Sequence, residues 1–400
     1  MKKLYTLAIL FTAAIGFSQN ATNTTDNNQE IQAIPVGYYN NATGTGYALK
    51  TQLKTIITNG HSPQSYTAGL WGLFANSLRD NFYENDGSLL DIYSENPTSA
   101  DPYNYTATSQ QCGNYNAEGV CYNKEHLIPQ SYFNSAMPMY SDAHHVVPSD
   151  GRVNGWRNNY AFGLVDATTT SPCNGGASNI PCNSQNGSKK GLNKNSGYSA
   201  GFSGIVFEPI DEFKGDVARS FLYFATRYET QMPGFYTAST SDSNGPEVTV
   251  MFDGSSNKVF SDTFLNILLT WHQNDPVSAK EIAFNNSIYT FQGNRNPYID
   301  HPEYACQIWS SQCAALSTPS FDFATISVYP NPSNNHRINI DSDVVLDEIQ
   351  LININGQLMQ QIKNPSAQGN TYTVENLPSG FYFMKITSDN QSTTRKVLIN

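Results

Sequence analysis

The residue pattern of this 400-residue chain changes near residue 315, and this change limits what the chain can fold into. Before it, apolar residues recur at intervals of three and four in residues 48–57, 215–228 and 262–272, a spacing typical of helices with one buried face. After it, short runs of β-branched and aromatic residues alternate with turn residues, which is typical of strands. Since 400 residues also exceed what one core usually organises, the chain needs at least two folding units.

The C-terminal unit is expected to be a small all-β sandwich over residues 326–400, after a Ser- and Pro-containing linker at 315–325. Its turns are predicted at NPSNN, NGQ and PSG. The predicted strands are ISVYP, RINI, EIQLINI, QLMQQI, TYTV, FYFMKI and RKVLI. The larger unit is expected to cover residues 34–314 and to be helix-rich.

The first residues of the chain are typical of an export signal. Residues 1–18 combine Lys2 and Lys3 with an apolar run from Leu4 to Phe17 that is too short to span a bilayer. A polar leader without apolar periodicity is expected at 19–33. Because no later stretch reaches the ~18 apolar residues of a spanning helix, we expect no transmembrane segment and a soluble protein after signal cleavage.

Six cysteines occur as three local pairs in a chain that carries an export signal. Local disulfides Cys112–Cys121, Cys173–Cys182 and Cys306–Cys313 are therefore expected, although six cysteines allow fifteen connectivities and only proximity favours this one. The absence of a C-x-x-C pair argues against structural zinc.

The formal net charge of −11 argues against a basic groove over the whole protein, the usual footprint of a strong nucleic-acid binder. It does not exclude an enzyme that acts on nucleic acid, because a bound metal and a few arginines can hold one or two phosphates. We expect weak, salt-sensitive non-specific affinity.

The stretch 215–228 illustrates the helical pattern. Asp216 can cap the helix, and one face is expected in the core, formed by Val217, Phe221, Phe224 and Tyr228. Arg219, Tyr223 and Arg227 fall on another face, which is expected either to be solvated or to look into a cleft.

Residue types suited to catalysis are densest in NKEHLIPQSYF (123–133) and SDAHHVVPSDGRVNGWRNNYAFG (141–163). Strands are expected to begin at His126 and at His145, followed by a helix capped by Ser149 or Asp150. That helix carries four polar side chains, Arg152, Asn154, Arg157 and Asn158. The local order is strand, strand, helix.

This cluster holds what phosphodiester hydrolysis requires, which is a base for water and ligands for a cation. His126 can accept a proton near neutral pH, and Glu125 and Asn154 offer oxygen atoms suited to Mg²⁺. Adjacent residues of a regular strand point to opposite faces. For Glu125 and His126 to converge, we therefore expect them where the strand begins irregularly.

These segments resemble the bacterial endonuclease I group of ββα-metal nucleases, which cleave DNA and often RNA in the periplasm or outside the cell. The similarity extends through YYNNATGTGYALKTQLKTII, FEPIDEFKGDVARSFLYFATRY and LLTWHQNDPVSAKEIAFNNSIYTFQGNRNPYIDHPEYACQIW. It implies an α+β fold with a ββα-metal motif, and sequence-independent cutting by a phosphodiester hydrolase.

The resemblance also implies roles for single residues. His126 takes the position of the general base, and Glu125 and Asn154 take those of the ligands of Mg²⁺, with Ca²⁺ or Mn²⁺ as alternatives. Arg219 is expected to join His126 as a catalytic residue by contacting the phosphate. Two more arginines are candidates for substrate binding, Arg157 and Arg295.

The chain departs from the family where Asp-Leu-His-Asn-Leu is usual, because His145 replaces the asparagine. His144 and His145 could bind a softer metal, but a structural role in the hairpin is the stronger expectation. His272 and His301 are likewise expected to be structural.

Residues from about 326 resemble the C-terminal sorting domain of type IX secretion in Bacteroidetes, through VYPNP, LININGQLM, LPSGFYFMKI and RKVLIN. This resemblance implies passage through the periplasm and the type IX machinery, release or attachment at the cell surface, and often removal of the domain. It implies no catalytic contribution.

Two alternatives to a nuclease stay open at this point. A phosphodiesterase acting on small molecules would use the same residues in a closed pocket, and a non-enzymatic secreted protein would bind surfaces or carbohydrates. The strand, strand, helix pattern with Glu125, His126 and Asn154 disfavours the second. DNA or RNA preference, the native metal and the oligomeric state stay open, since no base-reading motif is evident.

Overall fold

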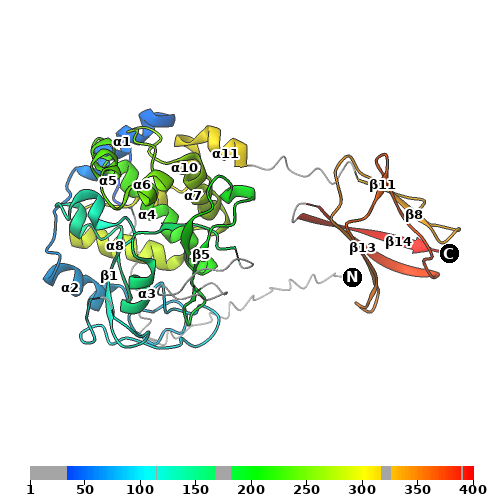
Figure 1. Ribbon diagram of the computed structural model, residues 1–400, viewed down its shortest axis with the longest axis horizontal. Helices are drawn as coiled ribbons and strands as arrows, with labels where there is room; N and C mark the ends of the chain where they lie inside the picture. Colours follow the sequence, from blue (N-terminus) through cyan, green and yellow to red (C-terminus); the bar gives the residue numbers. More distant parts are fainter. Residues whose placement is uncertain (1–33, 114, 167–181, 317–325, 389–390) are drawn as a thin grey trace, which may run out of the picture.

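The computed structural model describes residues 34–113, 115–166, 182–316, 326–388 and 391–400. Figure 1 shows a larger, mainly helical body and a smaller body of strands. The expected signal peptide, the leader and residues 317–325 of the linker lie outside the described residues. The boundaries of the two units therefore stay predictions.

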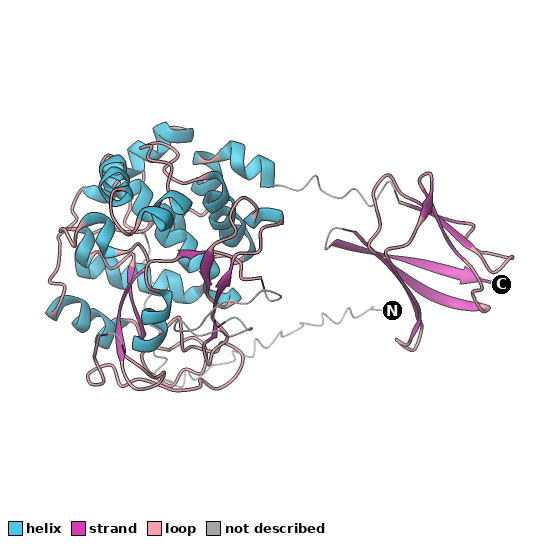
Figure 2. Ribbon diagram, viewed as in Figure 1, coloured by secondary structure: helices cyan, strands magenta, loops and turns pink. Residues whose placement is uncertain are grey.

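Helices form most of the larger body, and Figure 2 shows them in cyan. They are α1 (Gly46–Thr58), α2 (Ala68–Ser77), α3 (Gly151–Arg157), α4 (Lys214–Arg227), α5 (Met232–Thr240), α6 (Gly245–Met251), α7 (Asp262–Asn274), α8 (Ala279–Gln292), α9 (Pro297–Asp300), α10 (Tyr304–Ile308) and α11 (Ser310–Leu316). Its strands are β1 (Tyr122–His126), β2 (Val146–Asp150), β3 (Ala161–Phe162), β4 (Cys182–Asn183), β5 (Lys189–Leu192) and β6 (Ile205–Glu208). The expected α+β class is confirmed.

Helix α4 lies in the centre of the core, where it packs against α7, α1 and α9. The face predicted to be buried is buried, with Val217, Phe221, Phe224 and Tyr228 at most 1% exposed. Two details were wrong. The helix begins at Lys214 after Phe213, so Asp216 lies in its first turn and does not cap it. Arg219, Tyr223 and Arg227 are buried as well, because neighbouring helices cover α4 on more than one side.

Strands β1 and β2 form a two-stranded antiparallel ladder that leads directly into α3. Of the two predicted caps, Ser149 and Asp150, it is Asp150 that caps α3, by accepting hydrogen bonds from the backbone N–H groups of Arg152 and Val153. The first strand, however, ends at His126 instead of beginning there. Polar residues 123–125 form the ladder, so an apolar run could not reveal this strand.

A second sheet of the larger body has the strand order β3-β6-β5-β4, with β3 parallel to β6 and the other pairs antiparallel. Two of the three expected disulfides are present, Cys112–Cys121 and Cys306–Cys313, with Cα–Cα distances of 5.7 and 5.6 Å. Cys173 lies outside the described residues. Among the described residues, no helix combines the length and apolar character needed to cross a membrane.

The smaller body consists of two four-stranded sheets around its own core. One sheet has the order β10-β9-β13-β14 and the other β11-β12-β8-β7. The strands are β7 (Ser327–Tyr329), β8 (Ile338–Asp341), β9 (Glu348–Asn353), β10 (Leu358–Lys363), β11 (Ala367–Gln368), β12 (Thr371–Val374), β13 (Gly380–Ser388) and β14 (Gln391–Ile399). Every predicted strand is present, and the two-residue β11 was missed.

Candidate active site

The end of β1 and the first turn of α3 bring the three main candidate residues into one region. Glu125 and His126 are the last two residues of β1, and the Asn154 side chain donates hydrogen bonds to the carbonyl of Lys124 and to Ser149 Oγ, at 3.3 and 3.0 Å. Asn154 is thereby held against the residue that precedes Glu125. Because β1 pairs with β2 and α3 follows β2 without a break, the helix lies beside both strands.

The ladder is regular up to its last pair, because Glu125 is opposite Val147 and His126 is opposite Val146. The irregular strand start expected for these two residues is therefore wrong. Their side chains enter different surroundings, as alternation in a strand requires. Glu125 contacts Tyr93 and Arg157, whereas the His126 ring packs among aromatic side chains. A substrate phosphate would have to lie across the end of the strand to meet both.

Glu125 is a buried carboxylate, 3% exposed, and Tyr93 and Arg157 both contact the same oxygen. The Tyr93 hydroxyl donates to Oε1 at 2.9 Å, and Arg157 Nη1 lies 3.3 Å from Oε1. Burial raises the pKa of Glu125 to about 7, against the opposing effects of Arg157 and Tyr93. A bound cation would favour the charged carboxylate.

The donor set of this site fits a hard divalent cation. No described residue donates a hydrogen bond to Glu125 Oε2, and the same holds for Asn154 Oδ1, whose amide nitrogen makes the contacts of that side chain. Carboxylate and amide oxygens are the ligands that Mg²⁺ takes, together with several waters. Glu125 and Asn154 could therefore hold Mg²⁺ through these two oxygens.

A single contact shows which ring nitrogen of His126 carries the proton. Nε2 lies 3.0 Å from the carbonyl oxygen of Tyr140, and since a carbonyl only accepts, Nε2 carries the proton and Nδ1 the lone pair. Burial, followed by the neighbouring His145, lowers the pKa of His126 to about 3, so the free ring is neutral at physiological pH. The negative charge of a bound phosphate would raise this pKa and so assist proton uptake.

Aromatic side chains hold the imidazole in place. The His126 ring is nearly parallel to Tyr140, with ring centres 5.4 Å apart and an 8° angle, and it also stacks with Tyr66 at 5.7 Å. Lys124 lies over Trp71 and Tyr66 beside this stack. Sequence reasoning missed Tyr93, Tyr140 and Tyr66, because their distance along the chain gave no local signal.

Arg157 supports the site from within. It is 1% exposed, donates to the carbonyl of His126 at 2.8 Å and to that of Leu127, and pairs with Glu125. Arg157 therefore contacts both the Glu125 carboxylate and the backbone of His126. The structure therefore brings the Arg157 guanidinium to the site as a positioning group.

The other two candidate arginines lie in separate buried ion pairs. Arg219 on α4 forms a two-pronged pair with Glu281 on α8, at 2.5 and 2.8 Å. Arg295 forms a similar pair with Asp300, at 2.6 and 2.7 Å. Both side chains are at most 1% exposed, and their hydrogen-bond partners among the described residues do not include Glu125, His126 or Asn154.

The remaining histidines of the helical core have structural surroundings. Nε2 of His144, His145 and His272 contacts the carbonyl of Asn294, Met139 and Pro302, respectively. His145, which replaces the asparagine of the family pattern, packs against Phe224 and lies next to His126, with ring centres 5.8 Å apart. These contacts agree with the structural role expected for them.

Comparisons with known families cover both bodies of the chain. The model described as Endonuclease I matches residues 45–303, and the model described as a secretion system C-terminal sorting domain matches residues 327–400. The first match includes every candidate site residue. The second coincides with the strands of the smaller body.

Curated relatives point in the same direction. The chain is 33% identical over 276 residues to an extracellular ribonuclease of Bacillus amyloliquefaciens, which covers 68% of this chain and 78% of that protein. It is 31% identical over 277 residues to an extracellular ribonuclease of Bacillus subtilis (strain 168), with the same coverage. A shorter similarity, 28% over 94 residues, links 23% of the chain to 17% of the ulvan lyase NLR42 of Nonlabens ulvanivorans.

Proposed function

Since this chain belongs to the Endonuclease I family and is a secreted nuclease with a type IX sorting domain, we propose that it cuts DNA and RNA internally and without sequence preference. In this proposal His126 is the general base, and Glu125 and Asn154 bind one Mg²⁺. The observation that supports this proposal is that no described residue donates a hydrogen bond to Glu125 Oε2 or to Asn154 Oδ1, beside a histidine whose Nδ1 has the lone pair.

Each residue of the site has its own role in the proposed reaction. His126 Nδ1 takes a proton from a water molecule while Nε2 stays on the Tyr140 carbonyl, which keeps the ring oriented. Tyr93 and Arg157 hold Glu125 by Oε1 and so leave Oε2 for the cation. When bound, Mg²⁺ supplies positive charge for the phosphate oxygens and the leaving group.

RNA belongs in the proposed substrate range because two relatives are named as extracellular ribonucleases. DNA belongs there because the chemistry needs only a phosphodiester and no described element offers a base-reading contact. The chain's net charge of −11 fits weak, transient binding to either polymer.

The test is gel-monitored cleavage of supercoiled plasmid and of a long RNA by the purified secreted protein, with Mg²⁺ and with EDTA. Wild-type protein should nick the circle only with the metal, and Glu125→Ala should lose this activity. Glu303→Gln, which removes an exposed carboxylate of the DHPEY turn, is the matched control and should cleave normally.

Intact circles under every divalent ion, from protein shown to be folded, would contradict the proposal. Hydrolysis of a small phosphodiester by the same protein would then identify a small-molecule phosphodiesterase. Cleavage that persists in Glu125→Ala at the wild-type rate would instead contradict only the assigned ligand.

A further inference from the structure

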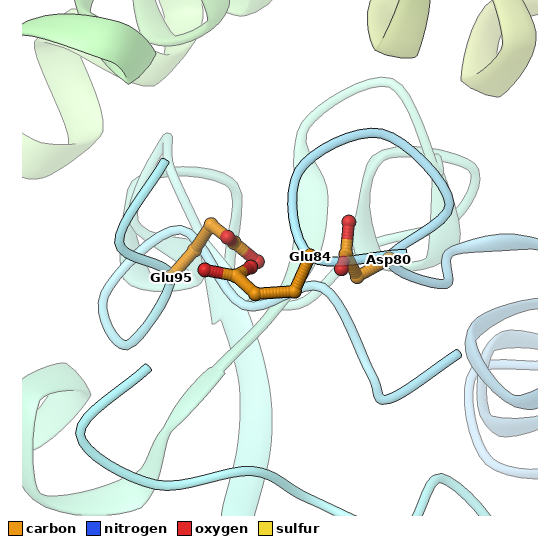
Figure 3. Close-up of side chains that lie close together, drawn as sticks. All are labelled: Asp80, Glu84 and Glu95. Carbon is orange, nitrogen blue, oxygen red and sulfur yellow. The ribbon is translucent and has the colours of Figure 1, made fainter. Parts of the chain in front are cut away.

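A second group of acidic side chains lies in the irregular segment between α2 and β1, among residues that the family resemblance did not single out. Asp80, Glu84 and Glu95 each offer a carboxylate oxygen, and these oxygens lie within 4.8 Å of one another. Figure 3 shows the side chains of Glu84 and Glu95 pointing toward each other, with Asp80 beside them. Their proximity calls for a compensating charge.

Two of these carboxylates are buried and have oxygens that no donor of the described residues reaches. Glu95 is 0% exposed, and no donor group of the described residues reaches either of its oxygens; its carboxyl lies against that of Glu84, with which it can share a proton. Asp80 is 1% exposed; its Oδ1 accepts from the backbone N–H groups of Phe82 and Tyr83, whereas its Oδ2 has no partner. Buried polar oxygens are normally paired, so three unpaired oxygens on two neighbouring carboxylates indicate a missing ligand.

No positive side chain of the described residues forms an ion pair with the cluster. Among the ion pairs formed by described residues, none includes Asp80, Glu84 or Glu95. Burial raises the pKa of Glu95 to about 9, followed by the charges of Asp101 and Asp80 and by the hydrogen bond to Glu84. Without a cation Glu95 therefore keeps its proton at neutral pH, and a bound cation would have to displace that proton.

We propose that Asp80, Glu84 and Glu95 bind a structural Ca²⁺ ion, at a site separate from the catalytic cation. Ca²⁺ accepts six to eight oxygen ligands in irregular geometry, which suits carboxylates from three points of an irregular segment. Mg²⁺ requires near-octahedral geometry and keeps several waters, which suits two buried carboxylates less well. Glu84 is exposed and provides an entry path for the ion.

The site would stabilise a segment that reaches the active site. The Glu95 N–H donates to the Asp91 carbonyl at 2.9 Å, and Asp91 Oδ1 accepts from the Tyr93 N–H at 2.8 Å. The Tyr93 hydroxyl in turn holds Glu125. A cation on Glu95 would therefore order the same short segment that positions a proposed ligand of the catalytic metal.

The proposal is tested with the full secreted chain carrying Glu125→Gln, so that the catalytic site cannot account for the result. After EDTA treatment and removal of the chelator, Ca²⁺ binding is measured by isothermal titration calorimetry and thermal unfolding. One ion should bind, with a Kd on the order of 10⁻⁴ to 10⁻³ M as in extracellular modules. At a Ca²⁺ concentration of roughly 100 times this Kd, the Tm of the protein should rise by a few degrees.

Three further variants in this background locate the ion. Glu84→Gln and Glu95→Gln should each weaken Ca²⁺ binding at least tenfold, whereas Glu303→Gln should leave it unchanged. Glu84 is exposed, so its variant keeps the test decisive even if Glu95→Gln fails to fold. Mg²⁺ at the same concentration should give no comparable rise in Tm.

Three results would overturn the proposal. The first is the absence of Ca²⁺ binding, or equal binding by Glu84→Gln. The second is an equal effect of Mg²⁺, which would refute the assignment to calcium. The third is stabilisation by Glu95→Gln that does not depend on calcium, since this would show that the carboxylates share a proton instead of a metal.

Discussion

His126 shows how a single residue is prepared for a task by its contacts. One nitrogen is held by the Tyr140 carbonyl, and the ring lies against Tyr140 and Tyr66. Its orientation and tautomer are thus set before any substrate arrives. Glu125 is prepared in the same way, by Tyr93 and Arg157 on one oxygen.

Replacing His126 should remove most hydrolysis without unfolding the protein. General-base catalysis contributes typically about 10²- to 10⁴-fold, so His126→Ala should lose kcat by roughly that factor. His126→Gln, whose amide can still donate to the Tyr140 carbonyl, should preserve packing yet be equally slow. Single-turnover plasmid cleavage and circular dichroism provide the measurements; wild-type turnover by either folded variant would reject the assigned role.

The pH dependence of cleavage should reflect Glu125 more than His126. The pKa of His126, lowered to about 3, leaves the free base neutral above that pH, whereas the pKa of Glu125 is raised to about 7. A cation binds the deprotonated carboxylate, so Mg²⁺ affinity should fall as the pH drops through 7. Raising the Mg²⁺ concentration should therefore shift the acidic side of the pH profile of kcat/KM to lower pH. If the acidic side does not shift, a group other than Glu125 titrates there.

Helix α4 shows, at the scale of elements, why a residue pattern can mislead. Its apolar stripe predicted one buried face, but the helix is buried on more than one side, and Arg219 forms an ion pair inside the protein. Arg219 bridges α4 to α8 through Glu281. This geometry gives the guanidinium a role in joining two helices.

Truncating Arg219 should destabilise the protein more than it affects catalysis. Arg219→Met leaves Glu281 buried without its partner, which typically costs about 3 to 5 kcal/mol. Arg219→Met combined with Glu281→Met should recover much of that loss. Urea unfolding measures the free energy of unfolding for each variant. A large rise in KM with unchanged stability would instead support the phosphate contact predicted from the resemblance.

At the scale of the whole molecule, catalysis and export belong to different parts of the chain. Every proposed site residue lies in residues 45–303, and residues 327–400 match a sorting domain with its own core. The two bodies can therefore be separated by function.

Deleting residues 326–400 should abolish secretion and leave the specific activity unchanged. Cell fractions and culture medium are assayed for Mg²⁺-dependent plasmid cleavage, normalised to the amount of folded protein. Activity should move from the medium to the periplasm. Loss of specific activity from a well-folded truncated protein would show that the sorting domain contributes to catalysis.

The sequence alone determined what depends on local pattern. The strands of residues 326–400 followed from alternation and turn residues, a helix cap at Ser149 or Asp150 from their position before a helix, and two disulfides from proximity. Long idiosyncratic strings allowed the family to be identified. In each case neighbouring residues carry the signal, so no long-range contact has to be known.

Only the tertiary structure decided what depends on distant contacts. A polar strand could form at 122–126 because β2 pairs with it, and Arg219 and Arg295 turned out to be interior because helices cover them. Tyr93 reaches Glu125 across 32 positions, and Asp80 approaches Glu95 across a turn of irregular chain. Burial and pairing between such residues arise from packing, which no periodicity along the chain encodes.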